Sequence, residues 1–223
     1  MSIAYNATSI TNGIVLYVDA ANVKSYPGTG NSVYDLSNYS SGISFYNSPV
    51  ITNKAFDFTS LDTDGLSISS TNYAGLINFT MESLFSLNGT HLHYDGTLLS
   101  SGDWNTTHWS FGINQSNTAI STRNPYISHA YTFNIGSWYH VVYRRAGTLI
   151  STFVNGVKLV DQTVTGFTPL TSGASNTAIG RETYAGGYFN LNGKIAMSRI
   201  YNRDLSDEEV RSNFNSLRGR YSI

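Results

Sequence analysis

A polar stretch in the middle of the chain gathers side chains suited to holding a sugar. It reads Gly102-Asp103-Trp104-Asn105-Thr106-Thr107-His108-Trp109. An aromatic ring can stack on a pyranose face while Asn, Asp and His groups fix the hydroxyls around it. Trp104 is flanked by polar residues and is expected to be exposed. Trp109 leads into an apolar strand and is expected in the core.

The candidate sugar-binding residues come from three segments of the chain. They are Asp103, Trp104, Asn105 and His108 in the polar stretch, together with Tyr126 and Tyr184 from two other loop or strand-end segments. The alternative is that these rings only fill the core and pave the sheets. The chain holds 16 Tyr and 11 Phe, and most large aromatic rings in folded proteins are substantially buried.

Two short patterns contain metal-binding side chains. Asp62-Thr63-Asp64-Gly65 precedes a predicted strand, and an oxygen-rich loop with two carboxylates suits a hard cation such as calcium. The alternative for this pattern is an Asx turn without a metal. His91, His93 and Asp95 alternate, so a strand would place two imidazoles and a carboxylate on one face, a set typical of transition-metal sites. Gly residues follow Asn88 and Asp95 on either side, which favours a solvent-facing hairpin edge without a metal.

The composition is that of a neutral, turn-rich chain. Its 223 residues are 40% hydrophobic and 13% aromatic, only 12% are charged, and 20 are Gly, which is typical of many short strands joined by polar loops. The formal net charge of −1 argues against nucleic acid and anionic membranes as partners. Cys is absent, which excludes disulfides and thiolate chemistry. The N-terminus lacks the pattern of a signal peptide, and no apolar run is long enough to span a membrane, so we expect synthesis in the cytoplasm.

Strand signals recur along the chain at the spacing of a β-sandwich. Residues 13–20 form a near-continuous apolar run that predicts a buried strand. Residues 79–87 alternate, which places one face in the core. In residues 138–160, alternating runs are separated by Ala146-Gly147 and by Asn155-Gly156, the latter a strong type I′ hairpin signal. We expect this three-stranded meander at the centre of a sheet, and one domain over residues 1–223.

The C-terminal segment predicts a helix. Ser206 and Glu209 form a capping box, and the acidic residues of the first turn suit the positive end of the helix dipole. Val210, Phe214 and Leu217 share one stripe, which we expect to pack on the sandwich. Gly219 is the expected end of the helix.

Several of these segments together resemble the concanavalin A-like lectin/glucanase superfamily, in its laminin-G-like and pentraxin-like branch. The resemblance extends over nearly the whole chain and is carried by GIVLYVDAANVKSYPGTG, YDLSN, KAFDFTSLDTDGLSI, FTMESLF, WYHVVYRRAGTLISTFVNGV and NGKIAMSRIYNRDLSDEEVRSNF. It implies an all-β jelly-roll sandwich of two curved antiparallel sheets with one short C-terminal helix. In pentraxin-like relatives the loop equivalent to Asp62 and Asp64 often supplies calcium ligands. The opening segment and the closing Arg-Gly-Arg-Tyr look most like domains of tailed-bacteriophage structural proteins.

The same superfamily includes glycoside hydrolases, whose retaining members need two carboxyl groups about 5 Å apart. The chain has only four Glu residues. Glu82 has no carboxylate at the second or fourth following position, Glu182 lies in a loop, and Glu208 and Glu209 belong to the predicted helix. No Gly-x-Ser-x-Gly elbow occurs either. The sequence therefore predicts a protein that is not an enzyme, with glycoside hydrolysis as a less favoured interpretation.

Two functions remain open. In the first, the chain is a bacteriophage virion protein, from a tail, fibre or capsid decoration, whose lectin-like domain adheres to glycans of the bacterial surface. In the second, it is a structural virion protein that binds other virion proteins or its own copies and recognises no sugar. The carbohydrate chemistry of Asp103 to Trp109 favours the first, and the absence of a complete family ligand site favours the second.

Overall fold

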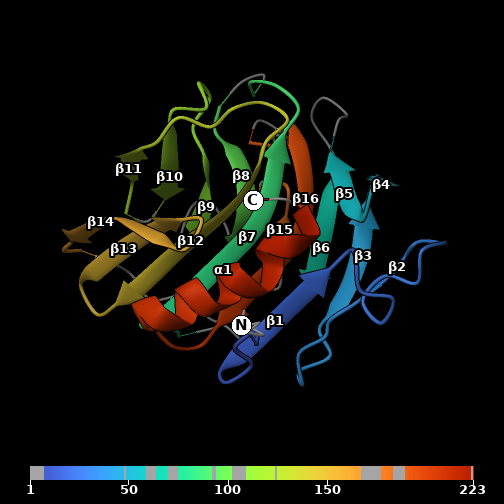
Figure 1. The fold of residues 1–223 in the computed structure, drawn as a ribbon, viewed down its shortest axis with the longest axis horizontal. Helices are drawn as coiled ribbons and strands as arrows, with labels where there is room; N and C mark the ends of the chain where they lie inside the picture. Colours follow the sequence, from blue (N-terminus) through green and yellow to red (C-terminus); the bar gives the residue numbers. More distant parts are fainter. Residues whose placement is uncertain are drawn as a thin grey trace, which may run out of the picture.

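Two antiparallel sheets of eight strands each pack face to face and form the body of the protein. The computed structural model describes residues 8–47, 49–58, 64–69, 75–91, 94–101, 109–123, 125–166, 177–182, 189–221 and 223. Within these residues one helix, α1 (Asp207–Tyr221), follows the last strand (Figure 1). The predicted all-β jelly-roll sandwich with a C-terminal helix is confirmed. In the described part of the chain, no helix is long and apolar enough to cross a membrane.

Sheet A contains the three-stranded meander expected from residues 138–160. Its strand order is β14 (Val157–Thr163), β13 (Leu149–Val154), β12 (Trp138–Ala146), β7 (Phe79–Leu87), β16 (Gly193–Tyr201), β5 (Ala55–Phe58) and β4 (Val50–Thr52), and β1 (Ile14–Asp19) also pairs with β16. The Asn155-Gly156 hairpin is confirmed, with φ of 50° and 74°, the positive values that a type I′ turn requires. The expected position of the meander at the sheet centre is wrong. β14 is an edge strand, because β12 pairs on its other side with the nine-residue strand β7.

Sheet B is built from shorter strands. Its order is β11 (Ile127–Ala130), β10 (Ala119–Arg123), β9 (Trp109–Ile113), β8 (Gly96–Ser101), β15 (Thr177–Ile179), β6 (Gly65–Ser69), β3 (Gly42–Tyr46) and β2 (Ser32–Tyr34). Alternate residues of these strands, such as Leu66, Phe111 and Ile120, are buried against the inner face of sheet A. Trp109 lies in this core at 2% exposure, as expected from the sequence.

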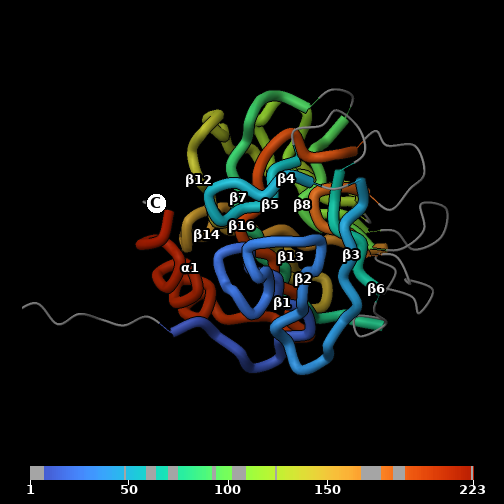
Figure 2. The backbone as a smooth tube through the Cα atoms, turned by 90° about the vertical axis from the view of Figure 1, so that its right-hand side faces the viewer, coloured from blue at the N-terminus to red at the C-terminus, as the bar shows by residue number. Residues whose placement is uncertain are grey.

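Helix α1 covers the outer face of sheet A over its central strands, so β7 is buried on both sides. Figure 2 shows the helix on one side of the sandwich and β3, β6 and β8 on the other. Val210 and Leu217 pack into two apolar clusters on the outer face of sheet A, which explains why every residue of β7 is buried. Phe214 is only half-buried, with its ring against His140. All three residues of the predicted stripe thus pack on sheet A, Phe214 with its ring against His140 and the Gly156 turn and still partly exposed.

The ends of α1 were predicted with unequal success. At the start, the Glu209 amide donates to Ser206 Oγ at 3.2 Å, and the Ser206 amide donates to Glu209 Oε2 at 2.8 Å. The capping box is therefore confirmed. At the other end the helix continues through Gly219 to Tyr221, so the expected stop is wrong. Arg220 adds a reason for the extra turn, since its guanidinium pairs with the buried Asp19 carboxylate at 2.7 Å and anchors the last turn to β1.

A buried polar cluster lies between α1 and sheet A. Glu82 and Asn213 are fully buried, and Asn213 Nδ2 donates to Glu82 Oε1 at 2.7 Å. Arg199 is 1% exposed, with Nη1 3.5 Å from Glu82 Oε2, and His140 Nε2 lies 3.7 Å from the same oxygen. The Ile10 amide donates to Asn213 Oδ1 at 2.7 Å. The cluster thus joins the N-terminal segment, the sheet and the helix.

Candidate functional site

The outer face of sheet B, opposite α1, carries a row of small hydroxyl side chains. Cross-strand register aligns one outward residue from each of seven neighbouring strands. These residues, called the serine row below, are Ser32, Ser44, Ser67, Ala178, Ser100, Ser110 and Arg123, in strand order from β2 to β10. Because side chains alternate along a strand, the apolar neighbours of the row, such as Val33 and Phe111, point into the core.

The serine row is open at one end and covered in its middle. Ser32 and Ser44 are exposed, whereas Ser100 is fully buried. The cover includes the segment that follows β15, because Ser100 Oγ donates to the Arg181 carbonyl at 2.9 Å. Gly65 makes room for this segment, since a Cβ atom at that position would lie 2.5 Å from the Arg181 side chain. The hydroxyl groups of β2 and β3 thus remain accessible.

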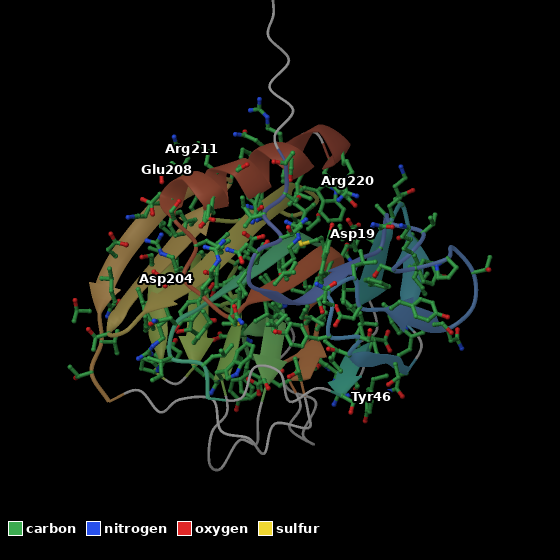
Figure 3. The ribbon with its side chains drawn as sticks, turned by 90° about the horizontal axis from the view of Figure 1, so that it is seen from below. Asp19, Tyr46, Asp204, Glu208, Arg211 and Arg220 are labelled. Atoms are coloured by element: carbon green, nitrogen blue, oxygen red, sulfur yellow. The ribbon has the colours of Figure 1, made fainter. Side chains whose placement is uncertain are left out.

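Arg181 is held over the open end by a tyrosine ring. Its guanidinium carbon lies 3.5 Å from the ring centroid of Tyr46, and its Nε donates to the Glu182 carbonyl at 3.1 Å. Arg181 is 8% exposed and Tyr46 is 42% exposed. A desolvated guanidinium on an aromatic face contributes on the order of 1 to 2 kcal/mol. Tyr46 is therefore a fixed ring that still faces solvent, and Figure 3 shows it far from α1.

The other end of the row, at Arg123 on β10, lies beside a buried carboxyl group. The Glu182 side chain is 3% exposed, and its Oε1 lies 3.6 Å from Arg123 Nε. Burial raises the pKa of Glu182 to about 7, although the charge of Arg123 and a hydrogen bond with Ser110 lower it, and Asp95 adds a small increase. The carboxyl group therefore changes its protonation state near neutral pH, where it can either donate or accept a hydrogen bond.

Aromatic rings lie beside this carboxyl group. The Arg123 guanidinium lies 4.1 Å from the ring centroid of Phe189, and Tyr94 stacks on the same ring at 4.8 Å between centroids. Tyr94 is 54% exposed. Hydroxyl groups, a guanidinium, a carboxyl group and stacked rings are the combination that fixes sugar hydroxyls and covers a sugar face.

A family model described as "Concanavalin A-like lectin/glucanases superfamily" matches residues 60–211. The chain belongs to this superfamily. A search of curated proteins finds no match to the sequence.

Solved structures share the superfamily fold at low sequence identity. One is the Trypanosoma rangeli sialidase in complex with 2,3-difluorosialic acid, with a TM-score of 0.72 and 18% identity over 97% of this chain and 34% of that one. Another is botulinum neurotoxin type C, whose cell entry is dependent upon interaction with two ganglioside molecules. That structure has a TM-score of 0.68 and 16% identity over 93% of this chain and 52% of that one. The chain thus spans about a third of the sialidase and half of the toxin chain, and the likeness shows the fold.

The predicted sugar-binding residues fall mostly outside the described part of this superfamily member. Asp103, Trp104, Asn105, His108 and Tyr184 are all outside it. Tyr126 is described and is 68% exposed, in the turn between β10 and β11. The strand ends that flank residues 102–108, Ser101 and Trp109, pair with each other, and Ser110 next to them pairs with Arg123. Tyr126 and these strand ends therefore share one end of sheet B.

The two metal patterns are described only in part. Asp64 is buried at 6% exposure beside β6, while Asp62 lies outside the described residues, so calcium binding by this pair stays a prediction. His93 is also outside them. His91 is buried at 4% exposure, which makes the expected solvent-facing position wrong for this residue. Burial lowers the pKa of His91 to about 4. In the described part of the chain, no three His, Cys, Asp or Glu residues are grouped to hold a metal.

His91 is buried because Gly96 leaves room for its ring and the Asn192 amide supplies a hydrogen bond. A Cβ atom on Gly96 would lie 2.1 Å from the imidazole, and the Asn192 amide donates to His91 Nδ1 at 3.1 Å. The glycine that suggested an exposed turn thus serves close packing of the ring instead. With its pKa lowered, the ring is neutral at physiological pH.

Sequence reasoning missed the residues that define the outer face of sheet B. No local pattern in the sequence marks Arg123, Arg181, Glu182 or Phe189 as members of a site. A usable signal existed for the row itself. Residues 42–45 and 65–69 alternate Ser or Gly with Ile, Leu or Phe, which is the pattern of a strand with one apolar face and one face of small polar groups.

Proposed function

We propose that the chain is a non-catalytic, lectin-like module that binds glycans on the outer face of sheet B. The observation that carries this proposal is the serine row, which ends at the pair formed by Arg123 and Glu182. A hydroxyl group both donates and accepts hydrogen bonds, so a row of them matches the hydroxyl groups of a sugar. One similar structure is a sialidase in complex with difluorosialic acid, and another is a toxin whose cell entry depends on two ganglioside molecules, which supports glycan as the ligand class.

The positions of the four Glu residues support a binding role without hydrolysis. Glu82 is enclosed between sheet A and α1, and Glu208 and Glu209 belong to the helix. Glu182 lies across the sandwich from these three, over sheet B. Retaining glycoside hydrolysis needs two carboxyl groups about 5 Å apart on one bond, and these four Glu residues do not form such a pair.

The proposal includes a place for the module in a bacteriophage virion, where it adheres to glycans of the bacterial surface. The support is the sequence resemblance of residues 13–38 and of the closing helix segment to tailed-phage structural proteins. Other virion proteins, and further copies of this chain, are the expected protein partners. Immunogold labelling of purified particles of the encoding phage tests this part, and particles free of the protein would contradict it.

A glycan array with three forms of the protein tests the binding function. Wild type should retain a defined set of bacterial-surface glycans. Arg123→Ala should bind them about tenfold or more weakly, the scale of a binding hot spot. Arg211→Ala is the matched control, because it removes the same charge from the exposed side of α1 (Figure 3). Absence of any retained glycan, or equal weakening by both variants, would contradict the proposal.

A purely structural role in virion assembly is the second candidate, and the edge of sheet A favours it. β14 pairs with β13 on one side, and Val157 on this strand is 69% exposed. An open strand edge can pair with a strand of another protein. Sedimentation analysis that shows a stable oligomer, together with an empty glycan array, would support assembly in place of adhesion.

A further inference from the structure

We infer that the glycan is an extended, uncharged oligosaccharide chain that lies along the open end of the serine row, between Tyr34 and Tyr46. This inference rests on the proposed function and specifies its ligand. The open end consists of the three outward serines of β2, β3 and β6, namely Ser32, Ser44 and Ser67.

The two tyrosines flank this floor on opposite sides. Tyr34 pairs with Gly42 and Tyr46 pairs with Gly65, so both rings belong to the same outer face as Ser44. Ser44 lies two residues from Gly42 and two from Tyr46 along β3. With a rise of about 3.3 Å per residue, the two tyrosines are separated by about 13 Å along the strand direction. A trough of this width holds a sugar ring on the serine floor.

The walls and the floor are accessible. Tyr34 is 54% exposed and Tyr46 is 42% exposed. Ser32, Gly42 and Ser44 are also exposed. The absence of a side chain at Gly42, opposite Tyr34, keeps the trough free on that side. Tyr46 is held in place by Arg181, 3.5 Å from its ring centroid, so little side-chain entropy is lost when a ligand stacks on it.

The direction of the row sets the length of the ligand. Neighbouring strands lie about 4.8 Å apart, so the open part from β2 to β6 spans about 10 Å across the strands. Beyond Ala178 the row is covered, because Ser100 is fully buried and donates to the Arg181 carbonyl, so the accessible floor is the part from β2 to β6. A single sugar unit would contact only part of this surface, whereas a chain crossing the strands contacts both tyrosines and successive serines.

The side chains of the trough also set the charge of the ligand. Its three serines and two tyrosines present hydroxyl groups and no charged group, and each hydroxyl both donates and accepts hydrogen bonds. The Arg181 guanidinium is already engaged, since it stacks on Tyr46 and its Nε donates to the Glu182 carbonyl. Neutral hydroxyl-rich sugars match this surface better than uronic or sialic acids do.

Binding to oligosaccharide series of increasing length tests the inference. The probes are neutral glucose, galactose, mannose and N-acetylglucosamine oligomers from monosaccharide to octasaccharide, with sialylated and uronic-acid oligomers beside them. Wild-type affinity should rise with length in a neutral series. Tyr34→Ala and Tyr46→Ala should each weaken binding of the long oligomers about tenfold or more and should leave binding of the shortest bound oligomer unchanged. Val157→Ala, an exposed change on β14, is the control.

The outcomes separate this inference from the function on which it rests. Binding that does not depend on length, or that is restricted to the charged series, would overturn the extended neutral ligand while leaving a glycan-binding module. Full affinity of Tyr34→Ala for the long oligomers would overturn the trough as well, since this variant removes an exposed ring and is expected to fold. No binding to any oligomer and none on the bacterial glycan array would overturn the proposed function itself.

Discussion

Replacing Glu82 by Gln should strongly destabilise the protein, because it leaves a buried arginine without its counter-charge. Arg199 is 1% exposed and lies 3.5 Å from the fully buried Glu82 carboxylate. The Gln side chain keeps the shape of Glu and an oxygen that can accept from Asn213 Nδ2. What is lost is the negative charge. The remaining partners of Arg199 are neutral, with Nη2 donating to Ser9 Oγ and Tyr17 Oη at 3.1 Å each.

The expected cost follows from the burial of both groups. Breaking a buried ion pair by removing one partner costs about 3 to 5 kcal/mol. For a chain of this size that corresponds to a fall in Tm of about 6 to 20 °C. The double variant Glu82→Gln/Arg199→Met removes both charges and should be more stable than the single variant, because no uncompensated charge is left. Urea unfolding followed by tryptophan fluorescence measures both, with one transition expected for a single cooperative domain.

The pH dependence gives a second readout of the same interaction. Burial alone would raise the pKa of Glu82, but the His140 ring, the Arg199 charge and the Asn213 hydrogen bond outweigh it and hold the pKa below its usual value of 4.5. A carboxyl group whose pKa is lowered on folding stabilises the protein above the unfolded-state pKa. That contribution is lost as the pH falls from about 4.5 towards the folded-state value. The Gln variant should therefore lose less stability than wild type over this acid range.

A cost below about 1 kcal/mol for Glu82→Gln would refute this reasoning, since surface substitutions commonly have effects of that size. A double variant less stable than the single variant would refute it independently, because it would show that the uncompensated charge on Arg199 is not the source of the loss.

Three further predictions concern the helix, the buried carboxyl group and calcium. Phe214→Ala should cost about 2 kcal/mol in urea unfolding, below the 3 to 5 kcal/mol of a fully buried Phe, because the ring is half-buried; a cost above 4 kcal/mol would contradict this. Glu182→Gln should gain stability relative to wild type as the pH rises from 5 to 8, by up to about 3 kcal/mol. The folded carboxyl group keeps its proton up to a pKa of about 7 while the unfolded one ionises near 4.5, so wild-type stability falls through that window, and parallel pH profiles would argue against it. Calcium should raise the Tm of wild type but not of Asp64→Asn, and a calorimetric titration without heat would exclude the site.

The sequence predicted those parts of the fold that depend on local signals. The Asn155-Gly156 turn, the Ser206 capping box and the burial of Trp109 follow from neighbours in sequence, and all three are confirmed. The centre of sheet A could not be predicted in this way, because β7 and β16 pair across more than a hundred residues. Long-range pairing of this kind has no signature in either strand alone.

The polar residues between distant elements were missed for the same reason. Asn213 lies on the buried stripe of α1 and looks like a surface residue by type, yet it joins Ile10, Glu82 and Tyr201. Arg123 and Glu182 meet only because the segment after β15 crosses the outer face of sheet B. Composition predicted short strands joined by polar, uncharged loops, but only the cross-strand register shows that serines of sheet B form a row.

Blocking the serine row tests the central claim most directly. Ser44→Arg places a long side chain on the exposed floor between Tyr34 and Tyr46, and Thr163→Arg adds the same side chain at an exposed position of β14 in sheet A. Biolayer interferometry on a glycan retained by wild type should show binding weakened about tenfold or more by Ser44→Arg and unchanged by Thr163→Arg, with equal Tm values for all three proteins. Full affinity of Ser44→Arg would contradict glycan binding on this face.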